Sequence, residues 1–176
     1  MITYRQLAAE ELTRLGEIDR TESIDTLYVQ HGTELEAVSG DFSATPWHGG
    51  HGEHSLEHEI EVCEFYRAAG GTVLGAFAGE RLVGIGIVVP SIRPGIAQLA
   101  YLHVSNGLRG QGIGVYLTEE MERLARAAGA SSMVISATPS ENTVRFYRGR
   151  GYEPTATPLP ELYEREPEDV HLEKRL

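Results

Sequence analysis

Glycines and one arginine gather between a predicted strand and a predicted helix. Residues 99–104 form an apolar run of β-forming residues, and residues 113–128 carry apolar side chains every three or four positions. The segment between them contains Arg109, Gly110, Gln111, Gly112, Ile113 and Gly114. Unpaired N–H groups at a helix start attract an anion, glycines let it approach the backbone, and arginine adds positive charge. The spacing predicts a phosphate-binding loop, because a plain turn needs fewer glycines.

Two common phosphate-binding patterns do not fit this loop. GxxxxGK[ST] is absent, and GxGxxG needs a third glycine where Leu117 stands. The pattern R-x-x-G-x-G over residues 109–114, preceded by strand residues Leu102, His103 and Val104, resembles the acetyl-CoA-binding motif of the GNAT superfamily of N-acetyltransferases. The resemblance implies that backbone N–H groups of residues 111–114 bind the pyrophosphate of acetyl-CoA. It also implies that the backbone of Leu102 and Val104 pairs with the pantetheine arm.

A second segment resembles the other signature of the same superfamily. Asn142 is followed by the pair Phe146-Tyr147 and then by Gly151-Tyr152. The resemblance covers residues 72–152 well and the N-terminal third loosely. It implies that Tyr147 is the general acid that protonates the leaving thiolate and that Asn142 hydrogen-bonds the cofactor arm. The alternatives are a tyrosine that only packs beneath the cofactor and an asparagine that only begins a helix.

The general base is not evident from the sequence. Histone-acetylating members of the superfamily carry a glutamate where this chain has Gln98, which cannot accept a proton. Strand alternation places Tyr101 and His103 on the opposite face from Gln98, unless a bulge redirects them. We therefore expect water to deprotonate the amine, with His103 as a less favoured base.

Four histidines, His48, His51, His54 and His58, are crowded in the sequence. Residues 54–58 match the inverted zinc-protease pattern HxxEH, and a helix would place its two histidines one turn apart. A five-residue pattern is common by chance, and no third ligand is evident. We expect no metal and interpret these histidines as polar residues at a helix edge, where they could rim the acceptor site.

The composition narrows the function further. The chain has 176 residues and a formal net charge of −11, with no basic stripe, so we expect no nucleic-acid partner and weakly favour a cationic acceptor. Its single cysteine, Cys63, excludes an intrachain disulfide. The start of the chain has no signal-peptide pattern, and the longest apolar run, residues 82–89, is too short to span a membrane. We expect a cytoplasmic protein.

The pattern predicts one α/β (α+β) domain over residues 1–176, and the resemblance implies that it has the GNAT fold. Its sheet is mixed, mostly antiparallel, flanked by helices and splayed at the cofactor site. The predicted strands are residues 2–7, 72–78, 81–89, 96–104, 133–138, 152–157 and 170–176, with a hairpin within 24–38. The predicted helices are 10–19, 54–69, 113–128 and a short one beginning after Ser140; the longer loops are 39–52, 90–95 and 158–169. In the helix over 113–128, Ile113, Leu117, Met121, Leu124 and Ala128 are expected to be buried, and Glu119, Glu122, Arg123 and Arg126 exposed.

The expected reaction is transfer of an acetyl group from acetyl-CoA to a primary amine of a small molecule or peptide. One alternative is a module that binds acyl-CoA without turning it over. A second alternative is a metal hydrolase built on the histidine cluster. A homodimer is compatible with the sequence, and the identity of the acceptor is open.

Overall fold

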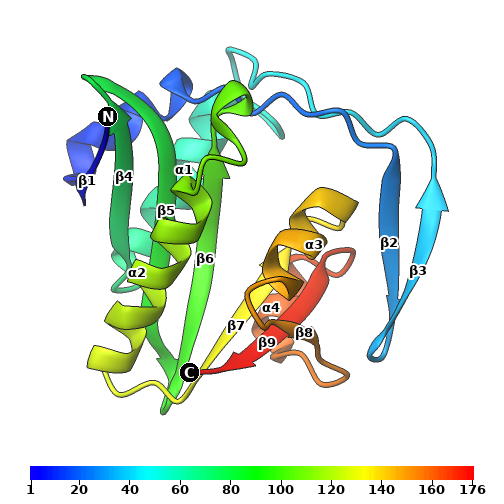
Figure 1. Cartoon of the computed structure of the whole chain (residues 1–176). Coiled ribbons are helices and arrows are strands. Elements are labelled where there is room, and N and C mark those ends of the chain that lie inside the picture. Colours follow the sequence, from blue (N-terminus) through cyan, green and yellow to red (C-terminus); the bar gives the residue numbers. More distant parts are fainter.

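The computed structural model describes all residues, 1–176. A seven-stranded sheet has the order β1-β4-β5-β6-β7-β9-β8, and a two-stranded hairpin lies apart from it (Figure 1). The strands of the large sheet are β1 (Ile2–Gln6), β4 (Thr72–Ala78), β5 (Arg81–Arg93), β6 (Ile96–Val104), β7 (Ser132–Ala137), β8 (Glu153–Pro154) and β9 (Val170–Arg175). The hairpin is β2 (Thr26–His31) with β3 (Glu34–Ser39). The helices are α1 (Leu56–Ala68), α2 (Ile113–Ala127), α3 (Glu141–Arg148) and α4 (Pro160–Arg165), with the 3₁₀ segments η1 (Ala9–Glu17) and η2 (Asn106–Leu108).

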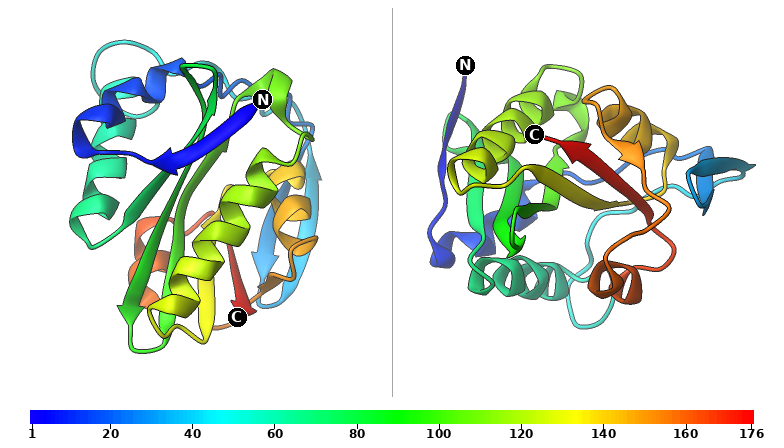
Figure 2. Two further views of the ribbon diagram at one scale, coloured as in Figure 1. Left: turned by 60° about the vertical axis from the view of Figure 1, so that its left-hand side comes forward. Right: turned by 90° about the horizontal axis from the view of Figure 1, so that it is seen from below.

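The sheet is mixed, and helices cover both of its faces. Every neighbouring pair of strands is antiparallel except β6 and β7, which run parallel. One core packs α2 and α3 against the sheet, and a second packs η1 and α1 against the other face. Helix α4 lies on the α1 side, as the view from below in Figure 2 shows. The predicted mixed, mostly antiparallel fold is confirmed.

Strands β6 and β7 pair over only part of their length. Their register joins four residue pairs, from Ile96 with Ser132 to Leu99 with Ile135. Beyond these pairs the two strands diverge, and Figure 1 shows β6 and β7 separating towards the top of the view. The edge of β6 over residues 100–104 that faces β7 therefore has no strand partner. We call the region between these two strands the opening.

A β-bulge lies in β6 where the opening begins. Ile87 of β5 pairs with Tyr101 and Val88 pairs with Leu99, so Ala100 has no partner. One extra residue reverses the alternation of side chains beyond it. Tyr101 therefore lies on the same face as Gln98, towards α1, and His103 follows Tyr101 on that face. The bulge that the sequence left open is present, so the expectation that these residues oppose Gln98 is wrong.

Helix α2 buries a wider stripe than the apolar pattern predicts. Ile113, Leu117 and Met121 are buried as expected, but so is Glu122, which is 5% exposed. The Glu122 carboxylate accepts hydrogen bonds from the Tyr152 hydroxyl at 2.9 Å and from Lys174 Nζ at 2.7 Å. Because these two donors reach it from other elements, the predicted exposure of Glu122 is wrong.

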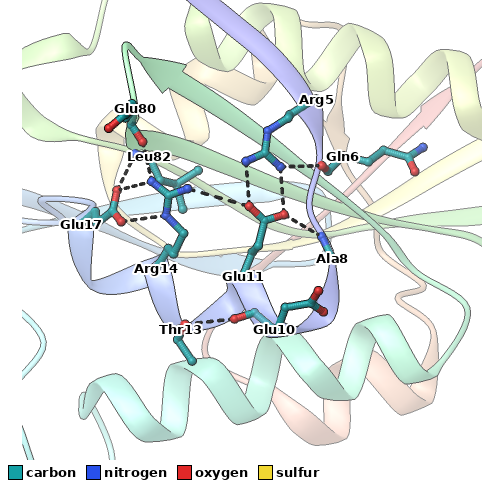
Figure 3. Close-up of polar contacts among 10 residues, drawn as sticks. All are labelled: Arg5, Gln6, Ala8, Glu10, Glu11, Thr13, Arg14, Glu17, Glu80 and Leu82. Carbon is teal, nitrogen blue, oxygen red and sulfur yellow. Dashed lines mark hydrogen bonds and ion pairs between the residues drawn. The ribbon is translucent and has the colours of Figure 1, made fainter.

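The helix predicted over residues 10–19 is present as η1, a 3₁₀ segment. Figure 3 shows the ion pairs that anchor this segment. Glu11 pairs with Arg5 at 2.7 Å, and Glu17 pairs with Arg14 at 2.8 Å. Glu17 also accepts the backbone N–H of Leu82 in β5 at 2.6 Å. These contacts position η1 beside the sheet, where the apolar Leu12 and Leu15 enter the core.

Three further segments differ from the sequence-based expectation. Residues 90–93 continue β5 instead of forming a turn, with an irregular register between Val89 and Arg93. The strand expected over 152–157 is reduced to the two residues of β8. The loop expected over 158–169 contains α4, which begins with Pro160 at its first position, where proline is favoured.

The β2–β3 hairpin and the two segments leading to it, residues 18–25 and 40–55, form what we call the strap. At its root, the Ser105 hydroxyl accepts the N–H of Asp19 at 3.0 Å, so the root is held by the end of β6. At its tip, Tyr28 donates its N–H to Pro139 O at 2.8 Å, and Gln30 accepts the N–H of His171 at 2.8 Å. The strap therefore bridges the opening from the β6 side to the β7–β9 side, as Figure 1 shows.

None of the helices has the length and apolar character needed to cross a membrane.

Candidate active site

The glycine-rich loop meets α2 at a helix start that is open to a ligand. Gly112 is the N-cap residue, with φ +84°, and makes no side-chain cap, and the first turn of α2 carries no acidic residue. Gly110 has φ +76°. A Cβ atom at either glycine would meet no atom within 4 Å, so both face open space. The unpaired N–H groups and the dipole of α2 thus give a site that fits a phosphate group.

The other residues of this loop have different surroundings. The ring of Phe146 on α3 lies 3.3 Å from where a Cβ of Gly114 would stand, so this glycine lets α3 approach α2. Ile113 is buried in the core. Gln111 Nε2 donates to Gly107 O at 3.4 Å, which keeps its side chain along the loop. Gly110 and Gly112 thus leave the backbone of the loop open, whereas Gly114 allows close packing behind it.

Arg109 is braced between β6 and the strap. Its Nε donates to Val104 O at 3.2 Å, and its Nη1 lies 3.6 Å from the Glu22 carboxylate. Asn142 at the start of α3 donates to the same carboxylate at 2.9 Å. Glu22 therefore joins two residues that the sequence predicts for cofactor binding, and the motif comparison gave no sign of its role.

The strand residues predicted to hold the pantetheine arm divide between the two faces. Leu102 and Val104 pack against the core on the α2 side, and their edge of the strand faces the opening. His103 points to the α1 side, where its ring lies 4.8 Å from that of Tyr101 and 5.5 Å from that of Trp47. Burial lowers the pKa of His103 to about 4, helped by the positive charges of Arg20 and Arg109. The imidazole is neutral at pH 7 and weakly basic.

Tyr147 is held in the core behind the opening. It is 5% exposed, and its ring packs edge-on against Phe146 and Tyr152. Burial raises its pKa well above that of a free tyrosine, so the hydroxyl keeps its proton at neutral pH. Ser140 begins α3 by accepting the N–H of Thr143 at 3.3 Å, as its sequence position predicts.

The opposite face of the opening carries carboxylates. The Tyr101 hydroxyl donates a hydrogen bond to the Glu59 carboxylate of α1 at 2.6 Å, and burial raises the pKa of Tyr101. Across the opening, Ser136 donates to Asp169 at 3.3 Å. Burial and the charge of Glu166 raise the pKa of Asp169 to about 7. Neither Glu59 nor Asp169 was singled out from the sequence, where acidic residues in a predicted helix and a predicted loop look like solvated charges.

The histidine pattern at residues 54–58 does not lie on one helix. Ser55 is the N-cap of α1, so His58 is helical while His54 precedes the helix with φ +64°. His48 contacts backbone carbonyls, and His51 pairs with Glu57. No group of three or more His, Cys, Asp or Glu side chains gathers in a geometry that could hold a metal ion.

A mixed sheet that opens beside a glycine-rich helix start offers a place for an acyl donor that carries phosphate groups. The sequence profile of the "Acetyltransferase (GNAT) family" matches residues 39–152, and the chain belongs to this family. It is therefore an acetyl-CoA-dependent acyltransferase, and the resemblance inferred from its two motifs is confirmed. A comparison with curated protein sequences finds no match.

Solved structures share the fold at low sequence identity. Nourseothricin acetyltransferase is 17% identical with a TM-score of 0.72, covering 99% of this chain and 98% of that one. The PaiA N-acetyltransferase from Thermoplasma acidophilum, solved with coenzyme A, is 22% identical with a TM-score of 0.63, covering 100% and 99%. A protein described as a streptothricin acetyltransferase from Bacillus anthracis, solved with acetyl coenzyme A, is 12% identical with a TM-score of 0.66, covering 98% and 95%.

Proposed function

We propose that residues 1–176 act as one N-acetyltransferase domain that moves the acetyl group of acetyl-CoA to a primary amine of a small molecule or peptide. The observation that carries this proposal is the opening itself. The start of α2, which fits a phosphate group, and Tyr147 lie on the α2–α3 side of the sheet. The carboxylates of Glu59 and Asp169 lie on the α1–α4 side. An anionic donor and a cationic acceptor would thus meet from opposite faces of one gap.

Three parts of the chain would bind the acetyl donor. The N–H groups of residues 111–114, with Arg109, would bind the pyrophosphate, since the glycines leave open space there. The free edge of β6 at Leu102, His103 and Val104 would pair with the pantetheine arm, as an added strand does. Asn142 would hydrogen-bond the same arm. Acetyl-CoA supplies an acetyl group already activated as a thioester.

Tyr147 would supply the proton, or the hydrogen bond, that stabilises the leaving thiolate. The hydroxyl is protonated at neutral pH, as a donor must be, and the ring is fixed by its neighbours on α3 and by Tyr152. A fixed ring directs the hydroxyl without loss of side-chain freedom on binding.

The acceptor would approach from the α1 side. Glu59 and the overall charge of −11 favour a protonated amine there. Two of the structures that align over nearly the whole chain are named for nourseothricin and streptothricin, which supports a small molecule over a peptide.

A thiol-release assay with acetyl-CoA and a panel of diamines, aminosugars, amino acids and short lysine peptides tests this function. We expect thiol release above the amine-free rate for at least one member, and mass spectrometry should show its acetylated product. Calorimetry on the same preparation measures acetyl-CoA binding separately. Binding without release for every amine would refute transfer and leave a module that only binds acyl-CoA.

A further inference from the structure

We call the face of the sheet that carries α1 and α4 the acceptor face. On this face, the opening brings two side chains to the same level. Gln98 of β6 pairs with Val134 of β7 just before the strands diverge. The next residue on that face of β7 is Ser136, two positions on. The next residue on that face of β6 is Tyr101, because Ala100 is bulged out. Tyr101 and Ser136 therefore face each other across the opening, next to the level at which the sheet separates.

Each of these two hydroxyls donates a hydrogen bond to a carboxylate. Tyr101 donates to Glu59 of α1, and Ser136 donates to Asp169, which directly precedes β9. The acceptor face thus has one carboxylate on each side of the opening. The two differ in their surroundings, because Glu59 receives a short hydrogen bond of 2.6 Å, whereas the bond to Asp169 measures 3.3 Å.

The groups around Asp169 disfavour its charged form. Burial and the negative charge of Glu166 raise the pKa of Asp169 to about 7, and the hydrogen bond from Ser136 opposes them. On β9, burial lowers the pKa of His171, so this ring is neutral at pH 7 and adds no positive charge. On α4, Arg165 lies over the rings of Phe65 and Tyr66 of α1, and Tyr163 lies against His171.

A buried polar atom lies beside this cluster without a partner. His171 pairs with Ser136 in the register of β7 and β9 and is 3% exposed. Its Nε2 contacts Glu166 O at 3.0 Å, but its Nδ1 is buried with no hydrogen bond. His171 also lines a cavity of about 200 Å³ between α4 and the sheet. The unpaired atom thus lies on the strand next to Ser136, and the cavity that His171 borders is lined from the paired part of β6 and β7 by Ile96, Val134 and Ile135.

We propose that Asp169 is the catalytic base, which takes the proton of the acceptor amine at the β7 side of the opening while Ser136 positions its carboxylate. The inference rests on the proposed function. The acceptor ammonium gives one proton to Asp169, and the lone pair that this frees forms a bond to the acetyl carbonyl carbon; the nitrogen then loses its second proton to water. The C–S bond breaks with its electron pair on sulfur, and Tyr147 protonates that sulfur. Asp169 releases its proton to solvent, from which Tyr147 recovers one.

The other candidates on this face suit the role less well. The amide of Gln98 does not accept a proton at neutral pH. The pKa of His103 is lowered to about 4, so its ring is a weak base at neutral pH. Glu59 accepts the Tyr101 hydroxyl and is placed to bind the ammonium of the acceptor before it loses its proton. A base that titrates near the working pH is the most effective, and Asp169 meets that condition.

The pH dependence of kcat tests the assignment. In the wild type, kcat should fall as the pH drops through about 7, because protonated Asp169 accepts no proton. We call this fall in kcat below about pH 7 the acidic limb. Asp169→Asn should lower kcat about 100-fold at pH 8 and remove the acidic limb, leaving a rate that rises with pH towards the pKa of the amine. Glu59→Gln should raise KM for the amine and keep the limb.

Two variants should move the limb in opposite directions. Glu166→Gln removes a negative charge and should shift it to lower pH, while Ser136→Ala removes a hydrogen bond to the carboxylate and should shift it to higher pH. Glu168→Gln, next to Asp169 and exposed, is the matched control and should not shift it. A carboxylate with only a structural role would produce no such pair of opposite shifts.

Carbon-13 NMR of the Asp169 carboxyl, assigned by its loss in Asp169→Asn, supplies a readout without turnover. We expect a midpoint near pH 7, lower in Glu166→Gln and higher in Ser136→Ala. A midpoint below pH 5, or a limb that disappears in Glu59→Gln and persists in Asp169→Asn, would overturn the proposal. A wild type that binds acetyl-CoA but acetylates no amine refutes the proposed function instead.

Discussion

Replacing Gly112 by aspartate tests the phosphate site at its most exposed point. A Cβ at Gly112 meets nothing within 4 Å, so the new side chain needs no repacking. The left-handed backbone, with φ +84°, costs a non-glycine residue about 1–2 kcal/mol of folding stability, and asparagine and aspartate tolerate it better than other residues. Gly112→Asn is therefore a matched control that carries the same backbone strain and nearly the same volume without the charge.

The expected loss of binding follows from the charge. An aspartate carboxylate about 5 Å from a phosphate, at an effective dielectric constant of about 20, is repelled by about 3 kcal/mol. Calorimetry should show coenzyme A binding weaker by about 2–4 kcal/mol in Gly112→Asp than in Gly112→Asn, or about 30- to 1,000-fold. Raising the salt concentration should narrow the gap between the two variants, because ions screen exposed charges.

The comparison is meaningful only if both variants fold, so thermal unfolding is measured in parallel. Both variants should lose similar stability, since they share the backbone strain. Equal affinities of Gly112→Asp and Gly112→Asn for coenzyme A would refute the placement of the pyrophosphate at the start of α2.

Three further changes address separate parts of the site and the core. Tyr147→Phe keeps the ring but removes the donor, so kcat should fall about 10-fold or more with acetyl-CoA binding nearly unchanged; wild-type turnover would reduce Tyr147 to a packing role. Glu22→Gln removes the carboxylate that pairs with Arg109, so acetyl-CoA should bind several-fold more tightly in a titration at low salt, and weaker binding would mean that Glu22 positions Arg109 and Asn142. Glu122→Ala leaves Lys174 and the Tyr152 hydroxyl without their partner, so urea unfolding should show a loss of about 2–4 kcal/mol, whereas Glu120→Ala, which breaks an exposed pair with Arg123, should cost less than about 1 kcal/mol.

Local patterns predicted the donor side of the site. The glycines of residues 109–114 and the helical period after them are signals within a few residues, so the loop, α2 and the strand before them lie where the sequence places them. Ser140 and the helix after it follow from capping preferences in the same way.

The acceptor face depends on contacts that are distant in sequence. Alternation along β6 reads the same with or without a bulge, so only the pairing with β5 shows that Tyr101 shares a face with Gln98. Glu122 looks exposed until Lys174, 52 residues away, and Tyr152, 30 residues away, are placed beside it. Asp169 sits in an acidic segment typical of a surface loop, and only the folded chain shows its burial and the contact with Ser136 of β7. Pro160 was the one local hint of that helix.

The strap turns the gap between β6 and β7 into a frame that is closed at both ends. Four residue pairs of β6 with β7 join the two halves of the sheet at one end, and the contacts of Asp19 with Ser105 and of Gln30 with His171 join them at the other. The width of the gap is thus set when the chain folds, and a ligand entering it need not bring the two halves together. The entropy of that ordering belongs to the folding equilibrium, so a larger share of each contact with the acetyl donor remains as binding affinity.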